Sequence, residues 1–412
     1  MFLTKLAIKN LFRHKKRTIV TALVITLGIF IFLVSDSLMV GLRDISLNNH
    51  LNLQTSHLQV MNTNYWEEKD EFPLDNLINV NEELENNLKS NEEILKATPR
   101  LYFTGTVNNG QEEFPITAVG IRPETDNEII NLSDYILKGE MPKEGNSAIL
   151  GKPLADLMGF EVGDYITLLF KTKEGTFNTI DAELTGILDT PNPQINEYQI
   201  FMPLSLVQNS LQLDNKASKY LVKLDNREQA LSITNNLNQE FENHEGNLRA
   251  YNWEKLSQEI LAMVRQGDIE NLVMLFIIIV LAAVGVINTI ILSALERLEE
   301  IGMMKALGLK VREIIYIFVI ESACIGTIGS FFGVIFGGVG VYFLYNIGIS
   351  ISAMTGGETT FGIPIAERIY GGWNPEAFLF IFFFGIIVSV LASILPARWG
   401  AKKDPVKAIH HK

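Results

Sequence analysis

Four long runs of hydrophobic residues dominate the pattern along the chain. They cover residues 18–40, 271–295, 314–346 and 377–395, and each holds few charged side chains. A run of about 20 apolar residues can cross the hydrocarbon core of a bilayer as a helix. Because the runs are continuous rather than alternating, they predict four transmembrane helices and not the strands of a barrel.

The polar stretch between the first two runs, residues 41–270, alternates between strand-like and helix-like patterns. Two parts of it each follow the order strand, helix, strand: 57–61, 81–95 and 97–107 near its start, and 219–224, 228–241 and 247–251 near its end. Short strands and turns fill the section between them. We therefore predict an α+β domain of two strand–helix–strand units with a mainly β insertion.

Charge predicts the orientation of the chain. Residues 1–20 carry six basic residues and no acidic one, and residues 396–412 carry five basic residues and one acidic. Basic residues near span ends favour the cytoplasmic side, so both termini are predicted to be cytoplasmic. Residues 43–270 hold 18 basic and 37 acidic residues, a net charge of −19. Such an acidic outer domain argues against nucleic-acid binding. We expect a multi-pass protein of the cytoplasmic (inner) membrane with a large extracytoplasmic, or periplasmic, domain.

The segment before the first span, residues 1–17, has the pattern of an amphipathic helix. Leu3, Leu6, Ala7 and Leu11 recur at helical spacing, and the nearby basic residues largely avoid that stripe. We expect this helix to lie on the inner face of the membrane.

The segment between the second and third spans, residues 296–313, is short and mixed in charge. Ile301, Met304 and Leu307 form an apolar stripe on a short helix, and Gly308 is placed to end that helix in a left-handed conformation. The stripe leaves a face to bury. It could rest on lipid or dock into a groove on a partner protein, and the pattern alone does not separate the two.

This segment resembles the coupling-helix region of the type VII ABC transporter permeases, the family of MacB, LolC, LolE and FtsX. The matching positions are Asn288, Glu296, Arg297, Glu300, Ile301, Gly302, Lys305, Ala306, Leu307 and Gly308. Further similarity lies in Ala148–Lys152 with Gly163 and Asp164, in Pro396–Arg398 with 404–409, and in residues 7–18. The resemblance follows the whole chain in order. It implies an ATPase docking surface made of Glu296, Arg297, Glu300, Ile301, Met304, Lys305 and Leu307.

We expect no nucleotide site in this chain. The string nearest to a P-loop runs from Gly145 to Pro153, with five residues between its glycines and Pro153 where the Mg²⁺-binding hydroxyl belongs. The single cysteine, Cys324, and the six histidines lack metal-ligand spacing, and no nucleophile elbow is present. We expect no catalytic, metal or cofactor site. The resemblance then implies that ATP and Mg²⁺ bind to a separate cytoplasmic ATPase dimer.

Small residues line the third span. Gly329, Gly333 and Gly337 lie four apart, a spacing that lets another helix approach closely. They indicate either a moving interface within a permease dimer or static packing inside one chain. Glu321 is the one carboxylate well inside this span, and we expect it to have a structural role.

The resemblance implies work by mechanotransmission, with a second permease, identical or paralogous, beside this one. The substrate expected first is a lipoprotein extracted from the outer leaflet of the inner membrane. Its acyl chains would enter an apolar cleft, for which we predict Phe30, Phe32, Leu33, Leu38, Met39, Met263 and Met274. A MacB-like peptide or drug exporter and an FtsX-like regulator of wall hydrolases are the alternatives. A membrane receptor is the alternative of another class, and the short inner segments argue against it.

Overall fold

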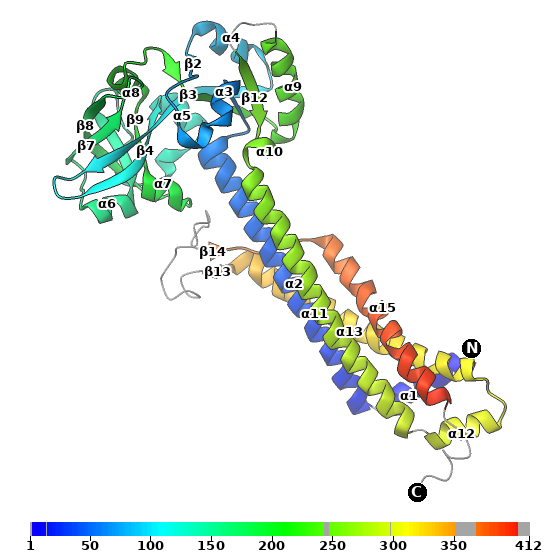
Figure 1. Cartoon of the computed structure of the whole chain (residues 1–412). Helices are drawn as coiled ribbons and strands as arrows, with labels where there is room; N and C mark the ends of the chain where they lie inside the picture. Colours follow the sequence, from blue (N-terminus) through cyan, green and yellow to red (C-terminus); the bar gives the residue numbers. More distant parts are fainter. Residues whose placement is uncertain (1, 14, 243–246, 297, 351–367, 403–412) are drawn as a thin grey trace. The chain divides into compact units, whose positions relative to one another are not determined.

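The computed structural model describes residues 2–13, 15–242, 247–296, 298–350 and 368–402 (Figure 1). It separates into two compact units. The helical unit takes its residues from Met1–Asp44, Met263–Ser350 and Arg368–Lys412, and the sheet unit contains Ile45–Ala262.

The helical unit is built from long apolar helices. Its helices are α1 (Phe2–Arg13), α2 (Lys15–His50), α11 (Gln258–Glu296), α12 (Leu298–Ala306), α13 (Val311–Ile347) and α15 (Pro375–Lys402), and β13 (Ile349–Ser350) pairs antiparallel with β14 (Arg368–Ile369). Four of the helices are long and apolar enough to cross a membrane: α2 with its continuation to Thr55, α11, α13 and α15. The prediction of an α-helical membrane protein with four spans is confirmed.

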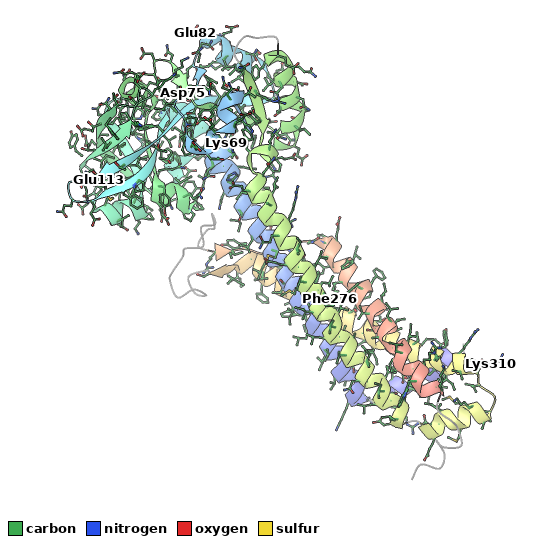
Figure 2. The ribbon with its side chains drawn as sticks, viewed as in Figure 1. Lys69, Asp75, Glu82, Glu113, Phe276 and Lys310 are labelled. Carbon is green, nitrogen blue, oxygen red and sulfur yellow. The ribbon has the colours of Figure 1, made fainter. Side chains whose placement is uncertain are left out.

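The first span has one buried and one exposed apolar face. Ala22, Ile25, Ile29 and Leu33 are buried and recur at the i, i+3, i+4 spacing of one helix face. The opposite face exposes Ile19, Leu23 and Leu27. Phe276 of α11 is exposed in the same way (Figure 2). Since lipid is as apolar as these side chains, close packing rather than exclusion of water selects the inward face.

The N-terminal helix α1 buries part of its apolar stripe inside the protein. Ala7 and Leu11 are buried, and α1 packs against α13. The predicted position of this helix on the inner face of the membrane stays a prediction.

The sheet unit is a mixed sheet with helices on its faces. Its strand order is β12–β1–β11–β3–β4–β9–β6–β8–β5, with β7 pairing β3 and β8. The strands are β1 (Leu58–Asn62), β3 (Ile94–Asn108), β4 (Glu113–Ile121), β5 (Ile136–Gly139), β6 (Ser147–Gly151), β7 (Tyr165–Lys171), β8 (Phe177–Leu188), β9 (Gln199–Pro203), β11 (Lys219–Leu224) and β12 (Leu248–Asn252), and a separate pair joins β2 (Ile78–Asn79) to β10 (Lys216–Ala217).

The helices of the sheet unit complete the predicted units. They are α3 (Thr63–Glu67), α4 (Glu82–Ser90), α5 (Pro123–Ile129), α6 (Lys152–Met158), α7 (Pro193–Tyr198), α8 (Leu204–Leu211), α9 (Ala230–Phe241) and α10 (Trp253–Leu256). β1, α4 and β3 form the first strand–helix–strand unit, and β11, α9 and β12 form the second. The predicted α+β fold with a mainly β insertion is confirmed.

One strand joins the insertion to the rest of the sheet unit. The first half of β3, up to Arg100, pairs with β11, whereas its second half, from Leu101, pairs with β4. Separate hydrophobic clusters lie over the two halves, one containing Leu88 and Tyr220 and the other Phe103 and Phe170. The insertion therefore continues the same sheet instead of forming a domain of its own.

The chain enters and leaves the sheet unit on neighbouring strands. A π-helical turn, Leu51–Thr55, connects α2 to β1, and α10 follows β12 immediately before α11. β1 and β12 are antiparallel partners with Leu58 opposite Asn252. The segments continuous with the first and second spans are thus hydrogen-bonded to each other at the edge of the sheet.

Candidate functional site

The candidate partner-docking site is α12 and the turn that follows it. The helix ends through hydrogen bonds from the backbone N–H of Leu307 to the Met303 carbonyl (2.9 Å) and of Gly308 to the Lys305 carbonyl (3.0 Å). Gly308 has φ +94°, the left-handed conformation that the sequence predicted for it. The next helix, α13, begins where Glu313 accepts a hydrogen bond of 2.7 Å from the N–H of Lys310. Figure 2 labels Lys310 in this turn.

The exposure of the apolar side chains on and just after α12 differs from the predicted stripe. Ile301 is only 2% exposed and packs with half-buried Met304 into the core of the helical unit. Met303 and Leu307 are 56% and 83% exposed. The expectation that Ile301, Met304 and Leu307 share one free face is therefore wrong. Six residues turn an α-helix by about 600°, so Leu307 lies about 120° away from Ile301 and does not follow it inward.

An ion pair ties α12 to the N-terminal helix. Arg13 Nη1 lies 2.7 Å from Glu300 Oε1, and both side chains are partly exposed. A pair this exposed adds little stability by itself. It nevertheless places Glu300 in a contact within its own chain. Glu296 is exposed and Lys305 half-buried, and Arg297 lies outside the described residues.

The glycines of α13 lie against α2. A Cβ added at Gly333 would be 2.7 Å from Ile29 Cβ, and one at Gly329 would be 2.8 Å from Ile25 Cβ. Thr26 Oγ1 donates a hydrogen bond of 3.0 Å to the Gly329 carbonyl. Gly337 similarly faces Leu33. The contacts of all three glycines in this structure are therefore contacts with the first span of the same chain.

The seven residues predicted for a substrate cleft do not meet in one place. Leu33 packs on α13 at Gly337, and Phe30 packs there at Gly340. Phe32 is buried, whereas Leu38 and Met274 are half-buried. Met39 lies on the other side of α2, where its Sδ would be 3.9 Å from a Cβ at Gly267 of α11. The side chain of Met263 is outside the described residues. The cleft stays a prediction.

The segment before α15 holds the far end of the first span. Asn374 Nδ2 donates a hydrogen bond of 3.0 Å to Asp36 Oδ2, and the N–H of Gly372 donates one of 2.8 Å to the Ser37 carbonyl. A Cβ at Gly41 would lie 1.8 Å from the Tyr370 carbonyl oxygen, so only glycine fits at that position. Asp36 thus has a polar partner in the span region. Glu321 is buried in the helical unit, and its role stays a prediction.

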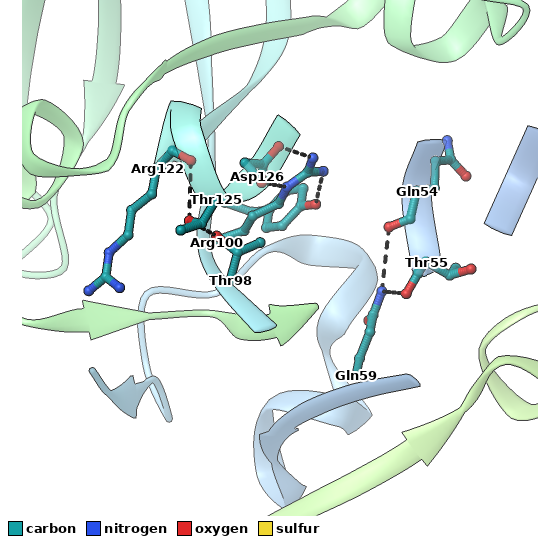
Figure 3. Close-up of polar contacts among 9 residues, drawn as sticks. Gln54, Thr55, Gln59, Thr98, Arg100, Arg122, Thr125 and Asp126 are labelled. Atoms are coloured by element: carbon teal, nitrogen blue, oxygen red, sulfur yellow. Dashed lines mark hydrogen bonds and ion pairs between the residues drawn. The ribbon is translucent and has the colours of Figure 1, made fainter. Parts of the chain in front are cut away.

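A buried ion pair sits at the middle of β3 (Figure 3). Arg100 Nε and Nη2 each donate a hydrogen bond of 2.7 Å to a carboxylate oxygen of Asp126, and Nη1 donates to Tyr102 Oη at 3.2 Å. Both charged side chains are at most 2% exposed. Burial alone would lower the pKa of Arg100, but Asp126 and Tyr102 raise it overall. The sequence pattern did not predict this pair. Its one local signal is an arginine within the otherwise apolar strand.

Comparisons with known proteins agree on one family. Residues 18–240 match the family described as MacB-like periplasmic core domain, and residues 272–405 match the FtsX-like permease C-terminal family. The lipoprotein-releasing system transmembrane protein LolE of Haemophilus influenzae is 22% identical over 412 residues, covering 94% of this chain and 93% of its own length. LolC of Neisseria meningitidis is 22% identical, with 77% and 79% covered.

Two further matches cover one part of the chain. The macrolide export ATP-binding/permease protein MacB of Campylobacter jejuni is 26% identical over 57% of this chain, which spans only 34% of its length. The periplasmic region of MacB from Actinobacillus actinomycetemcomitans has 16% identity and a TM-score of 0.37, covering 52% of this chain and 97% of that one.

Proposed function

The chain belongs to the family of ABC transporter permeases that includes LolC, LolE and MacB, and we propose that it is the membrane subunit of a transporter driven by a separate ATPase. The proposed contact with the ATPase is supported by the exposed side of α12 and the turn after it. The inner side of α12 is packed by its own chain, while Met303 and Leu307 remain exposed between two spans. Exposed apolar side chains on a short, fixed helix suit insertion into a groove of a partner.

The helices support a mechanical mode of action. α2 runs without a break from Lys15 to His50, and α11 runs from Gln258 to Glu296, so each extends beyond its span into the sheet unit. A continuous helix carries displacement along its axis. Closure of the ATPase dimer around ATP and Mg²⁺ would therefore move α12 and, through the spans, the sheet unit, beside a second permease, identical or paralogous.

For the substrate, we propose an acylated protein. LolC and LolE match over most of their own length, and their names describe lipoprotein release. Taking one sixteen-carbon chain out of a bilayer costs about 12 kcal/mol at about 0.8 kcal/mol per CH₂, so such cargo needs an energy-driven machine. MacB-like export is the second candidate, favoured by the match of residues 18–240 to the MacB-like domain.

The ATPase contact is tested with Leu307→Asp. The tagged chain is purified from its own membranes in mild detergent, and the co-purifying ATPase is measured by mass spectrometry. We expect Leu307→Asp to lower ATPase recovery about tenfold or more, because a buried apolar anchor contributes about 2 kcal/mol or more to an interface. Met303→Asp should act in the same direction.

Val311→Asp is the matched control, because Val311 is less exposed and opens α13, where an acidic residue is favourable. Full recovery of the ATPase with Leu307→Asp would contradict this docking face. Glu300 is unsuitable for the test, because its replacement would also remove the ion pair with Arg13.

The substrate is tested in the same preparation. We expect acylated proteins to accompany the complex when ATP is withheld and to be lost when ATP and Mg²⁺ are added. An ATPase without acylated proteins in either condition would contradict the lipoprotein substrate and favour MacB-like export.

A further inference from the structure

An apolar groove of about 880 Å³ lies in the helical unit between the N-terminal half of α2 and α13. Its walls comprise Leu11, Lys15, Thr18, Ile19, Ala22, Leu23 and Thr26 on one side, and Cys324, Thr327, Ile328, Phe332 and Phe336 on the other. None of these residues belongs to the docking face of α12 or to the predicted substrate cleft.

The hydroxyl groups that line the groove are hydrogen-bonded within the chain. The three hydroxyls all donate to backbone carbonyls of the chain: Thr18 to Leu11, Thr26 to Gly329 and Thr327 to Ala323, at 3.3, 3.0 and 2.8 Å. The wall therefore behaves as an apolar surface and suits a hydrocarbon chain better than a polar ligand.

The groove has the length of one membrane leaflet. Lys15 and Thr26 are eleven residues apart on α2, about 16 Å at about 1.5 Å per residue. Half of a hydrocarbon core of about 30 Å is about 15 Å. An acyl chain that entered beside Lys15 would end near Thr26.

The end of the groove carries a positive charge. Lys15 is the one charged residue among those lining it, and the side chain is exposed. Among the residues that the structure describes, no carboxylate forms an ion pair with Lys15. A phosphate at the end of an acyl chain in the groove would supply that missing negative charge.

We propose that the groove is a binding site for an anionic phospholipid of the leaflet next to Lys15. One acyl chain lies between α2 and α13, and the headgroup phosphate contacts the Lys15 ammonium. The lipid fills the space that α1, α2 and α13 leave open. The Lys15 ammonium makes the groove selective for a negatively charged headgroup. This site is separate from the cargo, so it holds whether or not the substrate is a lipoprotein.

The test uses the full-length chain in bilayer discs of phosphatidylcholine that contain phosphatidylglycerol with a photoreactive diazirine in one acyl chain. After illumination, mass spectrometry locates the adducts. We expect adducts on peptides covering 18–26 and 324–336, reduced about fivefold or more in Lys15→Glu. Lys16→Glu, which alters the exposed neighbour that does not line the groove, should leave the yield unchanged.

Two further measurements keep the proposal falsifiable. Thr327→Trp fills the groove and should reduce the adducts without changing any charge. Size-exclusion chromatography confirms that each variant is folded. Equal yields from photoreactive phosphatidylcholine and phosphatidylglycerol, unaffected by Lys15→Glu, would mean ordinary boundary lipid and overturn the proposal. Cys324 is the single cysteine. Cross-linking of Cys324 between two copies by a bismaleimide would also overturn the proposal, because it would place a second chain at the groove.

Discussion

Replacing Asp126 with asparagine is expected to lower the free energy of unfolding of the sheet unit by about 3–5 kcal/mol. The buried guanidinium of Arg100 would then face an amide whose NH₂ group donates where the carboxylate accepted. Arginine cannot escape by losing its proton, because a guanidinium stays protonated even where burial disfavours its charge. A buried charge without a counter-charge is the costliest polar defect in a protein interior.

The measurement is denaturant unfolding of the full-length chain in detergent, followed by hydrogen exchange of peptides from β3. Glu128→Gln is the control, because the pair of Lys96 with Glu128 lies on the same elements but is about half exposed. We expect that control to change stability by less than about 1 kcal/mol. Similar effects of the two variants would show that burial does not govern the Arg100–Asp126 pair.

Gly333→Ala is expected to destabilise the helical unit by about 1–3 kcal/mol, the usual cost of overpacking. Its new Cβ would lie 2.7 Å from Ile29 Cβ and 2.9 Å from Ile29 Cγ2. Cβ is the stiffest part of that side chain, so α13 and α2 would have to separate. The hydrogen bond from Thr26 to the Gly329 carbonyl lies on the same contact line and would lengthen too.

Gly338→Ala on the same helix provides the matched comparison. Its Cβ would meet Phe378 at 3.5 Å, an ordinary contact. This change should be neutral or stabilising by about 0.5–1 kcal/mol, because alanine loses less backbone entropy than glycine in a helix. Melting temperatures of both variants in detergent decide the matter. Equal melting temperatures of the two variants would mean that the close contact of Gly333 with α2 does not determine stability.

The features that the sequence predicted depend on local pattern. The spans follow from the length of the apolar runs, and β1, α4, β3 and β11, α9, β12 follow from their periodicity. Gly308 could be assigned a left-handed conformation because few other residues tolerate it. These assignments need no knowledge of what lies next to the segment in space.

The features that the sequence did not predict depend on neighbours. Periodicity placed Ile301 and Leu307 on one stripe, but only the structure shows that the helix ends between them. Arg100 and Asp126 are 26 residues apart, and nothing in either segment marks the other as its partner. The glycine stripe likewise did not indicate whether its neighbour belonged to the same chain or to a second one.

The pairing of β1 with β12 gives the sheet unit a direction of mechanical weakness. The chain leading to α2 joins β1 at Leu58, and the chain leading to α11 leaves β12 at Asn252, so both attach at the same end of one ladder. Forces that pull these two segments apart would break its hydrogen bonds one after another, as in a zipper. A push or twist applied to both segments together loads none of them in that way. The pairing of β1 with β12 therefore tolerates concerted motion of the first two spans and separates when the two spans move apart.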